Sequence, residues 1–300
     1  MPVVLLIIAI LVLSQSANFI RFAHADASAI GFWRLLMACM ILLPIVFYKK
    51  QFSELQKTST KQKVQIFFCA FFLFVHFYFW FLSVQKTTVA NSMILFTTNP
   101  LFTAIGAWFF FHEKLQKRHA ISLVLCFSGI FWMVRESLEI NPKNFQGDIL
   151  GFLCAIAFSA YVLSGKSLRN SLSNLPFVLS IYAVCGFFFF VAMLVTHAPF
   201  LGYDAQTWAS FAALTIGSTL LGHALFTHCL KYLNINFMSC STLVEPVISA
   251  LTASYLFGEA IRSAAVTGFV FVTLGILTLY SPYFYDLFTK KTVQPKRLTL

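Results

Sequence analysis

The sequence predicts an all-α integral membrane protein with ten transmembrane helices, arranged as two inverted-topology repeats of five helices each. Three observations predict this fold class: an apolar composition, ten apolar segments of spanning length, and an internal repeat of about half the chain. Hydrophobic residues make up 59% of the 300 residues and charged residues only 10%, and the mean hydropathy is +0.81. Such a composition excludes a soluble domain and indicates a polytopic membrane protein.

The apolar segments have the length of membrane spans. A helix needs about 20 mostly apolar residues to cross roughly 30 Å of hydrocarbon. Ten segments meet this requirement, near residues 2–22, 28–48, 64–83, 88–111, 118–135, 147–166, 175–196, 206–230, 235–257 and 263–283. The first begins without a basic region or a good cleavage site, so we expect a retained helix and not a signal peptide. All seven cysteines lie within these segments and are expected to be buried small hydrophobes.

The chain repeats itself at an offset of 146 positions. Asn99-Pro100 interrupts one apolar helix, and Glu245-Pro246 interrupts another at the equivalent place. Further identities at this offset are Ala104/Ala250, Ala107/Ala253, Val124/Val270, Gly129/Gly275 and Ile130/Ile276. A second copy of a five-helix repeat must insert upside down, because five crossings end on the opposite side of the membrane. We expect repeats over residues 1–140 and 141–300, the second with a basic tail, joined by the polar segment 136–148.

The positive charges predict the orientation. Fifteen Lys and Arg residues fall in the loops and tail on the side of the N-terminus, five fall on the other side, and Arg34 lies within a helix. The positive-inside rule then predicts cytoplasmic termini and a location in the cytoplasmic (inner) membrane. Topology therefore accounts for most of the net charge of +11. This charge implies some attraction to anionic membrane lipids and needs no nucleic-acid partner.

Four motifs resemble those of a known transporter family. They are Ser16-Ala17-Asn18-Phe19, Phe32-Trp33-Arg34, Asn99-Pro100 followed by Glu113, and Glu245-Pro246 followed by Gly258-Glu259. In order, spacing and duplication they are similar to the paired modules of the drug/metabolite transporter superfamily, EamA type. The resemblance covers nearly the whole chain and implies a secondary transporter. Two departures fall where the family lines its cavity: Gln15-Ser16-Ala17 replaces a Trp-Gly before the helix 1 Asn, and Phe158-Ser159-Ala160-Tyr161 replaces a Trp-led version.

The two Pro interruptions predict a polar site at the middle of the membrane. Pro removes a backbone donor and clashes with the carbonyl four residues back, so Pro100 and Pro246 should open their helices. Freed carbonyls in hydrocarbon persist only where protein or a wet cavity covers them. Glu245 lies beside the second break, where a charge costs on the order of 3 kcal/mol. A substrate, a proton or a cationic partner would offset this cost. The alternative is a protonated Glu245 hydrogen-bonded to a neighbouring helix.

Other polar and aromatic residues are candidates for the same site. Arg34 lies too deep in its helix for a simple interface anchor and is a candidate for the cavity or a gate, although its long stem is also able to reach outward. His76 shares a helix face with Phe72 and Trp80, and such an aromatic stripe also suits contact with lipid or core packing. The remaining candidates for hydrogen bonds to a substrate are Asn18, Asn99, Tyr161, Tyr182 and His223. At equivalent ends of the repeats, Glu113 and Glu259 are expected to act as paired gate or helix-end supports, unless they are simply solvated.

No pattern for catalysis, a metal or a cofactor stands in the sequence. Gly165-Lys166-Ser167 lacks the first Gly of a phosphate-binding loop, and His112-Glu113 lacks the second His of a zinc-protease motif. We therefore expect a secondary transporter, not an enzyme, which alternates access around a midplane cavity. Its expected substrate is an amino acid, an amine or a nucleoside-like cation, with proton coupling and a homodimer as options. The alternative is a membrane-embedded enzyme acting on a lipid or lipid-linked substrate.

Overall fold

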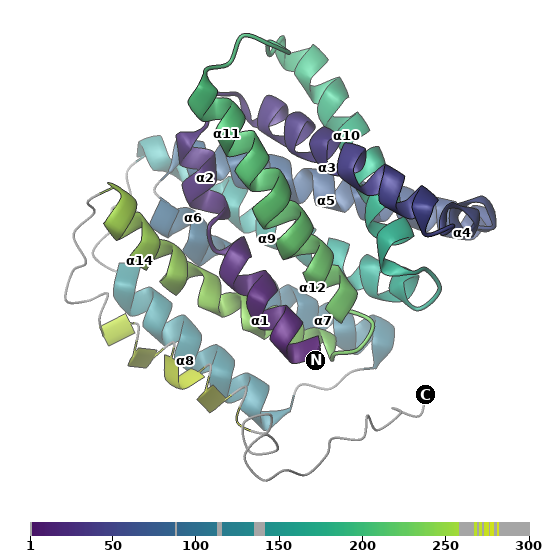
Figure 1. Ribbon diagram of the computed structural model, residues 1–300. Coiled ribbons are helices and arrows are strands. Elements are labelled where there is room, and N and C mark those ends of the chain that lie inside the picture. The colour runs from purple at the N-terminus through teal and green to yellow at the C-terminus, as the bar shows by residue number, and fades with distance from the viewer. Residues whose placement is uncertain are drawn as a thin grey trace.

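Within the part of the chain that the computed structural model describes, every element is a helix (Figure 1). The described residues are 2–87, 89–112, 116–134 and 142–257, with scattered positions between 267 and 281. Seven helical stretches among them are long and apolar enough to cross a membrane. These are Pro2–Phe22, Ala27–Tyr48, Thr60–Lys86, Phe145–Arg169, Asn174–Thr196, Ala205–Cys229 and Ile235–Leu256. The predicted segments 88–111 and 118–135 are also helical, whereas segment 263–283 lies mostly outside the described residues.

The helices divide between the two halves of the chain. The first half contains α1 (Pro2–Leu13), α2 (Ser16–Phe22), α3 (Ala27–Tyr48), α4 (Phe52–Gln56), α5 (Thr60–Lys86), α6 (Val89–Phe96), α7 (Asn99–Phe111) and α8 (Lys117–Val134). The second half contains α9 (Pro142–Arg169), α10 (Asn174–Thr196), α11 (Ala205–Ala213), η1 (Leu214–His223), α12 (Ala224–Cys229), α13 (Ile235–Ser241), η2 (Thr242–Val244) and α14 (Glu245–Phe257).

Side-chain caps begin several of these helices. Ser59 and Gln62 form a reciprocal capping box at the start of α5, which satisfies two backbone donors that the first helical turn leaves free. Asp204 accepts a hydrogen bond from the backbone N–H of Thr207 at the start of α11 (2.7 Å). Asn234 does the same for α13, accepting from the N–H of Phe237 (3.1 Å). The polar residues between apolar segments therefore define where these helices begin.

Three of the apolar rods are interrupted. A turn at Ser14 and Gln15 separates α1 from α2, residues 97 and 98 separate α6 from α7, and the 3₁₀ turn η2 separates α13 from α14. Pro100 and Pro246 are the second residues of α7 and α14. Pro is tolerated there because the first turn of a helix has no hydrogen-bonded N–H to lose. The turn after α1 was not predicted, because neither Pro nor Gly marks it in the sequence.

The rod from α11 to α12 contains a second irregularity that was not predicted. Its middle, η1, is a π-helix of ten residues. Thr219 Oγ1 donates to the Leu214 carbonyl five residues back (2.8 Å), which follows the wider π register. Gly222 lets this segment approach α1, since a Cβ there would lie 2.7 Å from Leu13 Cδ2. Periodicity did not reveal the π-helix, because it differs from an α-helix in hydrogen-bond register and not in apolar character.

The predicted linker between the two halves is too long at its C-terminal end. The polar segment 136–148 predicts a linker of that length, but α9 already begins at Pro142. The reason is that Pro stabilises the first position of a helix as readily as it ends a preceding one. Residues 142–148 therefore extend the second half by two helical turns before its apolar segment.

Helices from both halves pack together throughout the described fold. The most extensive contact joins α5 to α9, followed by α3 with α10. The α1 helix runs along η1 and α12, and these segments lie side by side in Figure 1. Buried rings such as Phe77, Phe189 and Phe226 fill the interior, whereas Ile105 and Phe109 stay exposed on the outer surface. An apolar exterior is what contact with lipid requires.

Candidate functional site

One small cavity lies at the centre of the described helices. Its lining comprises Leu13, Ser16, Arg34, His76, Phe77, Trp80, Phe96, Phe158, His223, Phe226 and Glu245. Five of the candidate residues from the sequence analysis are among them, on α3, α5, η1 and α14. The cavity has a volume of about 30 Å³, enough for one or two water molecules. A metabolite would need this space to widen.

Glu245 carries the carboxylate of the cavity. It is the first residue of α14 and follows the 3₁₀ turn η2 directly. Its side chain is buried, and within the described residues it makes no hydrogen bond or ion pair. The start of α14 supplies the positive end of a helix dipole, which favours an anion at this place. The carboxylate is thus held at the cavity wall without a protein partner of opposite charge among these residues.

Arg34 carries the positive charge of the cavity. Only 1% of this residue is exposed, so its side chain extends into the protein and not outward to the membrane surface. Nε donates to the Thr219 hydroxyl at 2.5 Å, and Cζ lies 4.2 Å from the centroid of the Phe77 ring. The buried Nη2 has no hydrogen-bond partner. Neutral groups therefore hold the guanidinium, and no ion pair joins it to Glu245 among the described residues.

Two histidines lie beside these charges. His76 Nδ1 is 3.1 Å from Cys154 Sγ and 3.4 Å from the Cys154 carbonyl oxygen. The His76 and His223 ring centroids are 6.2 Å apart, and His223 meets the Phe77 ring edge-on at 4.9 Å. His223 Nδ1 is buried without a partner. His76 thus belongs to the cavity and to the packed interior, not to a lipid-facing stripe.

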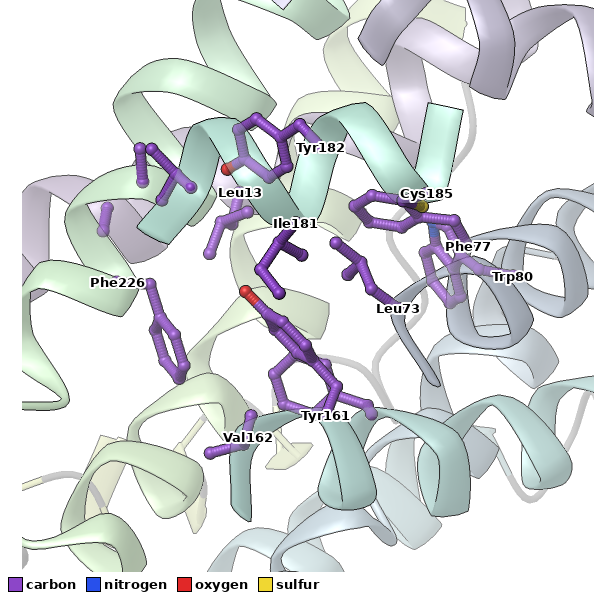
Figure 2. Packing of buried hydrophobic residues seen from close by; sticks show 14 of the residues in the cluster. Leu13, Leu73, Phe77, Trp80, Tyr161, Val162, Ile181, Tyr182, Cys185 and Phe226 are labelled. Carbon is purple, nitrogen blue, oxygen red and sulfur yellow. The ribbon is translucent and has the colours of Figure 1, made fainter. Parts of the chain in front are cut away.

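Aromatic rings form the rest of the wall. The Phe96 ring centroid lies 5.4 Å from that of Trp80 and 5.2 Å from that of Phe158, which in turn lies 6.0 Å from that of Phe226. Figure 2 shows Phe77 and Trp80 together on one side of the cluster and Phe226 on the other. The phenylalanines of this wall are not among the residues predicted from the sequence. The repeat offset would have found one of them, since Trp80 and Phe226 are 146 positions apart.

Four candidates from the sequence analysis do not line the cavity. Asn18 donates to the Gln15 side chain, and Tyr182 donates its hydroxyl proton to the Thr219 carbonyl at 3.2 Å. Tyr161 is buried next to Phe158, with its hydroxyl unpartnered; Figure 2 shows it projecting toward the interior from α9. These side chains surround the cavity as a second layer.

Asn99, the fourth, stands at the break between α6 and α7 and joins three helices. It donates to the Phe96 carbonyl (2.9 Å) and accepts from the Ser239 hydroxyl (2.8 Å). Its own carbonyl accepts from the Ser159 hydroxyl (2.9 Å). The Phe96 carbonyl near Pro100 is therefore satisfied by the Asn99 side chain, and the Asn99 carbonyl by a buried hydroxyl from α9. Such partners are the condition for an interrupted helix in a membrane.

Glu113 and Glu259 lie outside the described residues. Pro100 and Pro246 are both buried next to the interruptions they follow. Among the described residues, no group of three His, Cys, Asp or Glu side chains could hold a metal ion, and the cysteines there are all free thiols.

Comparison with known proteins identifies the kind of molecule to which this cavity belongs. The sequence model of the EamA-like transporter family matches residues 1–135 and, a second time, residues 145–281. The chain belongs to this family. As an EamA-like transporter it is an all-α, multi-pass membrane protein with two EamA repeats and a secondary transporter of a small molecule. The family is not an enzyme family, so the alternative of a lipid-modifying enzyme is set aside.

Individual relatives agree with this membership. The uncharacterized transporter YxxF of Bacillus subtilis (strain 168) is 22% identical over 284 residues, which cover 93% of this EamA-like chain and 87% of the relative. The S-adenosylmethionine uptake transporter of Rickettsia felis (strain ATCC VR-1525 / URRWXCal2) is 24% identical over 251 residues, covering 81% and 79%. A solved crystal structure with 15% sequence identity matches 99% of both chains with a TM-score of 0.78, and so has the same fold.

Proposed function

We propose that this protein moves an amine-bearing metabolite across the cytoplasmic membrane by alternating access around the central cavity. The substrate class comprises amino acids, amines and nucleoside-like cations, and Glu245 binds the substrate amine or a coupling proton. The observation that carries the proposal is the buried, unpaired Glu245 carboxylate at a helix interruption. A charge at this depth is costly unless a cation or a proton offsets it. The S-adenosylmethionine of one relative contains both an amino acid and a nucleoside, which fits this class.

The proposed architecture is ten spans in two inverted repeats, residues 1–140 and 141–300. Contacts between the halves support it. The α5–α9 contact has a counterpart at the 146-residue offset in the packing of α1 against η1 and α12. Phe77 and His223 are themselves 146 positions apart, and their rings meet at 4.9 Å. Equivalent residues of two repeats touch only when they lie close to the two-fold axis that relates the repeats. In an inverted repeat this axis lies in the membrane plane.

The test is transport by the Glu245→Gln variant in proteoliposomes. Amines and amino acids are supplied outside, with and without a pH gradient, and uptake is compared with wild type. We expect the variant to lose transport or its dependence on the pH gradient, because a neutral amide replaces the only described carboxylate of the cavity. Expression and monodispersity should stay near wild type.

A matched control is Glu54→Gln. Glu54 lies outside the cavity and accepts hydrogen bonds from the Ser173 backbone and hydroxyl at 3.0 and 2.8 Å. The same carboxylate-to-amide change there should leave substrate selectivity and pH dependence unchanged. Normal flux and normal pH dependence in Glu245→Gln would mean that Glu245 is a protonated structural residue and would refute the proposal.

A further inference from the structure

The cavity contains opposite charges that do not neutralise one another. Arg34 and Glu245 both line it, yet no ion pair between them is present in the described structure. Each is at least nine-tenths buried, with 1% and 8% of the residue exposed. The other titratable groups on the wall are His76 and His223. The cavity therefore presents one cationic and one anionic group to whatever enters it.

Arg34 is incompletely satisfied. Its Nε bonds to a neutral hydroxyl and its plane lies against a neutral ring, while Nη2 is buried without a partner. Removing a guanidinium from water is expensive, and neutral contacts offset only part of that cost. A carboxylate compensates it far better, since its two oxygens match the guanidinium fork. Thr219 and Phe77 hold Arg34 in place for such a ligand.

The pair of charges restricts the substrate class of the proposed function. A simple amine would meet Glu245 favourably but would bring a second positive charge into a small cavity beside Arg34. A simple carboxylate would have the opposite difficulty. Only a ligand with both an ammonium and a carboxylate compensates both residues, and the aromatic wall of Trp80, Phe96 and Phe158 suits an apolar remainder.

We infer that the substrate is a zwitterion of the amino-acid type, with its carboxylate on Arg34 and its ammonium on Glu245. This inference rests on the proposed function and narrows it, because simple amines and nucleoside-like cations without a carboxylate are excluded. It assigns Arg34 as the group that discriminates an amino acid from its decarboxylated amine. Thr219 is a positioning residue that acts through Arg34.

The test uses purified full-length protein in proteoliposomes. Uptake of each of the twenty amino acids selects the one that is transported best. Its decarboxylated amine and its deaminated acid then compete against it. We expect each analogue to compete at least tenfold more weakly than the amino acid. An amine that competes equally well, or is transported when no amino acid is, overturns the zwitterion inference and leaves the proposed function standing. If no amino acid, amine or nucleoside-like cation is transported, both the inference and the proposed function fail.

Variants assign the discrimination to Arg34. In Arg34→Gln, the apparent affinity for the amino acid should fall at least tenfold, to that of the amine, while the affinity for the amine stays equal or improves. Should this variant lack monodispersity, Thr219→Val provides the second reading, since it keeps the charge but removes the hydroxyl 2.5 Å from Nε. The Thr219→Val variant should lower the apparent affinity for the amino acid several-fold and leave the affinity for the amine unchanged.

Thr215→Val is the matched control for Thr219→Val. Thr215 lies on the same π-helix, and its hydroxyl donates to the Arg34 backbone carbonyl (3.1 Å) and not to the guanidinium. Its ratio of amino-acid to amine affinity should equal that of wild type. The role of the guanidinium would be overturned if Arg34→Gln or Thr219→Val kept the wild-type ratio of amino-acid to amine affinity. It would also be overturned if Thr215→Val changed this ratio as much as Thr219→Val does.

Discussion

The hydrogen-bond partners of the buried Arg169 and the half-buried Lys166 show what distinguishes a structural charge from an unsatisfied one. Arg169 Nε donates to the Thr227 carbonyl (3.1 Å), and Lys166 Nζ donates to the carbonyls of Leu230 and Leu233 (2.7 and 2.8 Å). These cations complete the C-terminal end of the rod from α11 to α12, where carbonyls lack helical partners. Arg34 bonds no carbonyl in the described structure, and this difference in partners marks it as a group available to a ligand.

Asp204 forms a polar contact between loops at one end of the bundle. Its Oδ2 lies 2.8 Å from His24 Nδ1, and its Oδ1 accepts from the Thr207 N–H. The hydrogen bonds from His24 and Thr207 lower the pKa of Asp204 to about 2. Because the pKa is depressed in the folded state, the stabilisation is complete above the ordinary carboxyl pKa of about 4 and is lost as the pH falls through 2.

We therefore predict that Asp204→Asn loosens the two loops at every pH above about 4. Hydrogen exchange followed by mass spectrometry should show faster exchange around residues 22–27 and 199–207 in the variant. The difference from wild type should shrink as the pH approaches 2. Asp148→Asn is the control, because Asp148 accepts from Thr87 at a different contact. Wild-type exchange in Asp204→Asn would contradict the prediction.

Five of the cavity-lining residues lie at irregular points of their helices. Leu13 and Ser16 flank the turn between α1 and α2, and Phe96 ends α6. Glu245 follows η2, and His223 ends the π-helix η1. Each irregularity frees or shifts backbone groups, which a membrane protein tolerates only inside protein or along a cavity. This part of the site, including Glu245, is therefore built where regular hydrogen bonding stops, whereas Arg34 and His76 project from the regular helices α3 and α5.

The close approach of the π-helix η1 to α1 depends on Gly222 and can be tested by substitution. In Gly222→Ala the added Cβ would lie 2.7 Å from Leu13 Cδ2, which forces η1 and α1 apart. We expect a loss of about 1–3 kcal/mol, typical of overpacking, and a lower thermal midpoint of the purified protein. Because Leu13 also lines the cavity, substrate affinity should fall as well.

Gly186→Ala is the matched control. Gly186 lies within α10, and a Cβ there would meet Leu35 Cβ at an ordinary 3.6 Å. Replacing Gly by Ala inside a helix without a clash gains up to about 1 kcal/mol. Its thermal midpoint should therefore equal or exceed that of wild type. Equal midpoints for the two variants would show that η1 and α1 do not need their close approach.

The distribution of charge over the whole molecule is the basis of the proposed orientation. The 27 residues of α5 span about 40 Å at 1.5 Å per residue. Lys86, at its end, donates to Gln146 near the start of α9 (2.9 Å), whereas Lys57 precedes its beginning. Residues 57 and 143 therefore lie at opposite ends of the bundle, consistent with the fifteen-to-five division of positive charges.

We predict that Lys57→Cys is labelled from the cytoplasm and Lys143→Cys from the outside. An impermeant thiol reagent applied to intact cells should modify the cysteine at 143 and leave that at 57 unmodified until the membrane is permeabilised. Native cysteines should contribute little background, since Cys39 is half-buried and the other six are buried. Labelling of both positions from the same side would refute the proposed topology.

Much of the fold was determined by the sequence itself. The apolar segments, the duplicated Asn99-Pro100 and Glu245-Pro246 motifs and the positive charges are local or periodic features, and spanning helices follow from them because lipid leaves the backbone no other partner. The same reasoning selected Glu245, Arg34 and His76, since polar groups are rare and costly inside a membrane.

Only the tertiary structure decided which candidates share a cavity. It brings Arg34 beside Phe77 and Thr219, and it turns Asn99 into a junction between helices. Contacts of this kind depend on how rods far apart in the sequence rotate and cross, which periodicity does not encode. The turn after α1 and the π-helix η1 also arise from packing. Whether a segment forms α-helical or π-helical hydrogen bonds depends on the helices packed against it as well as on its own residues.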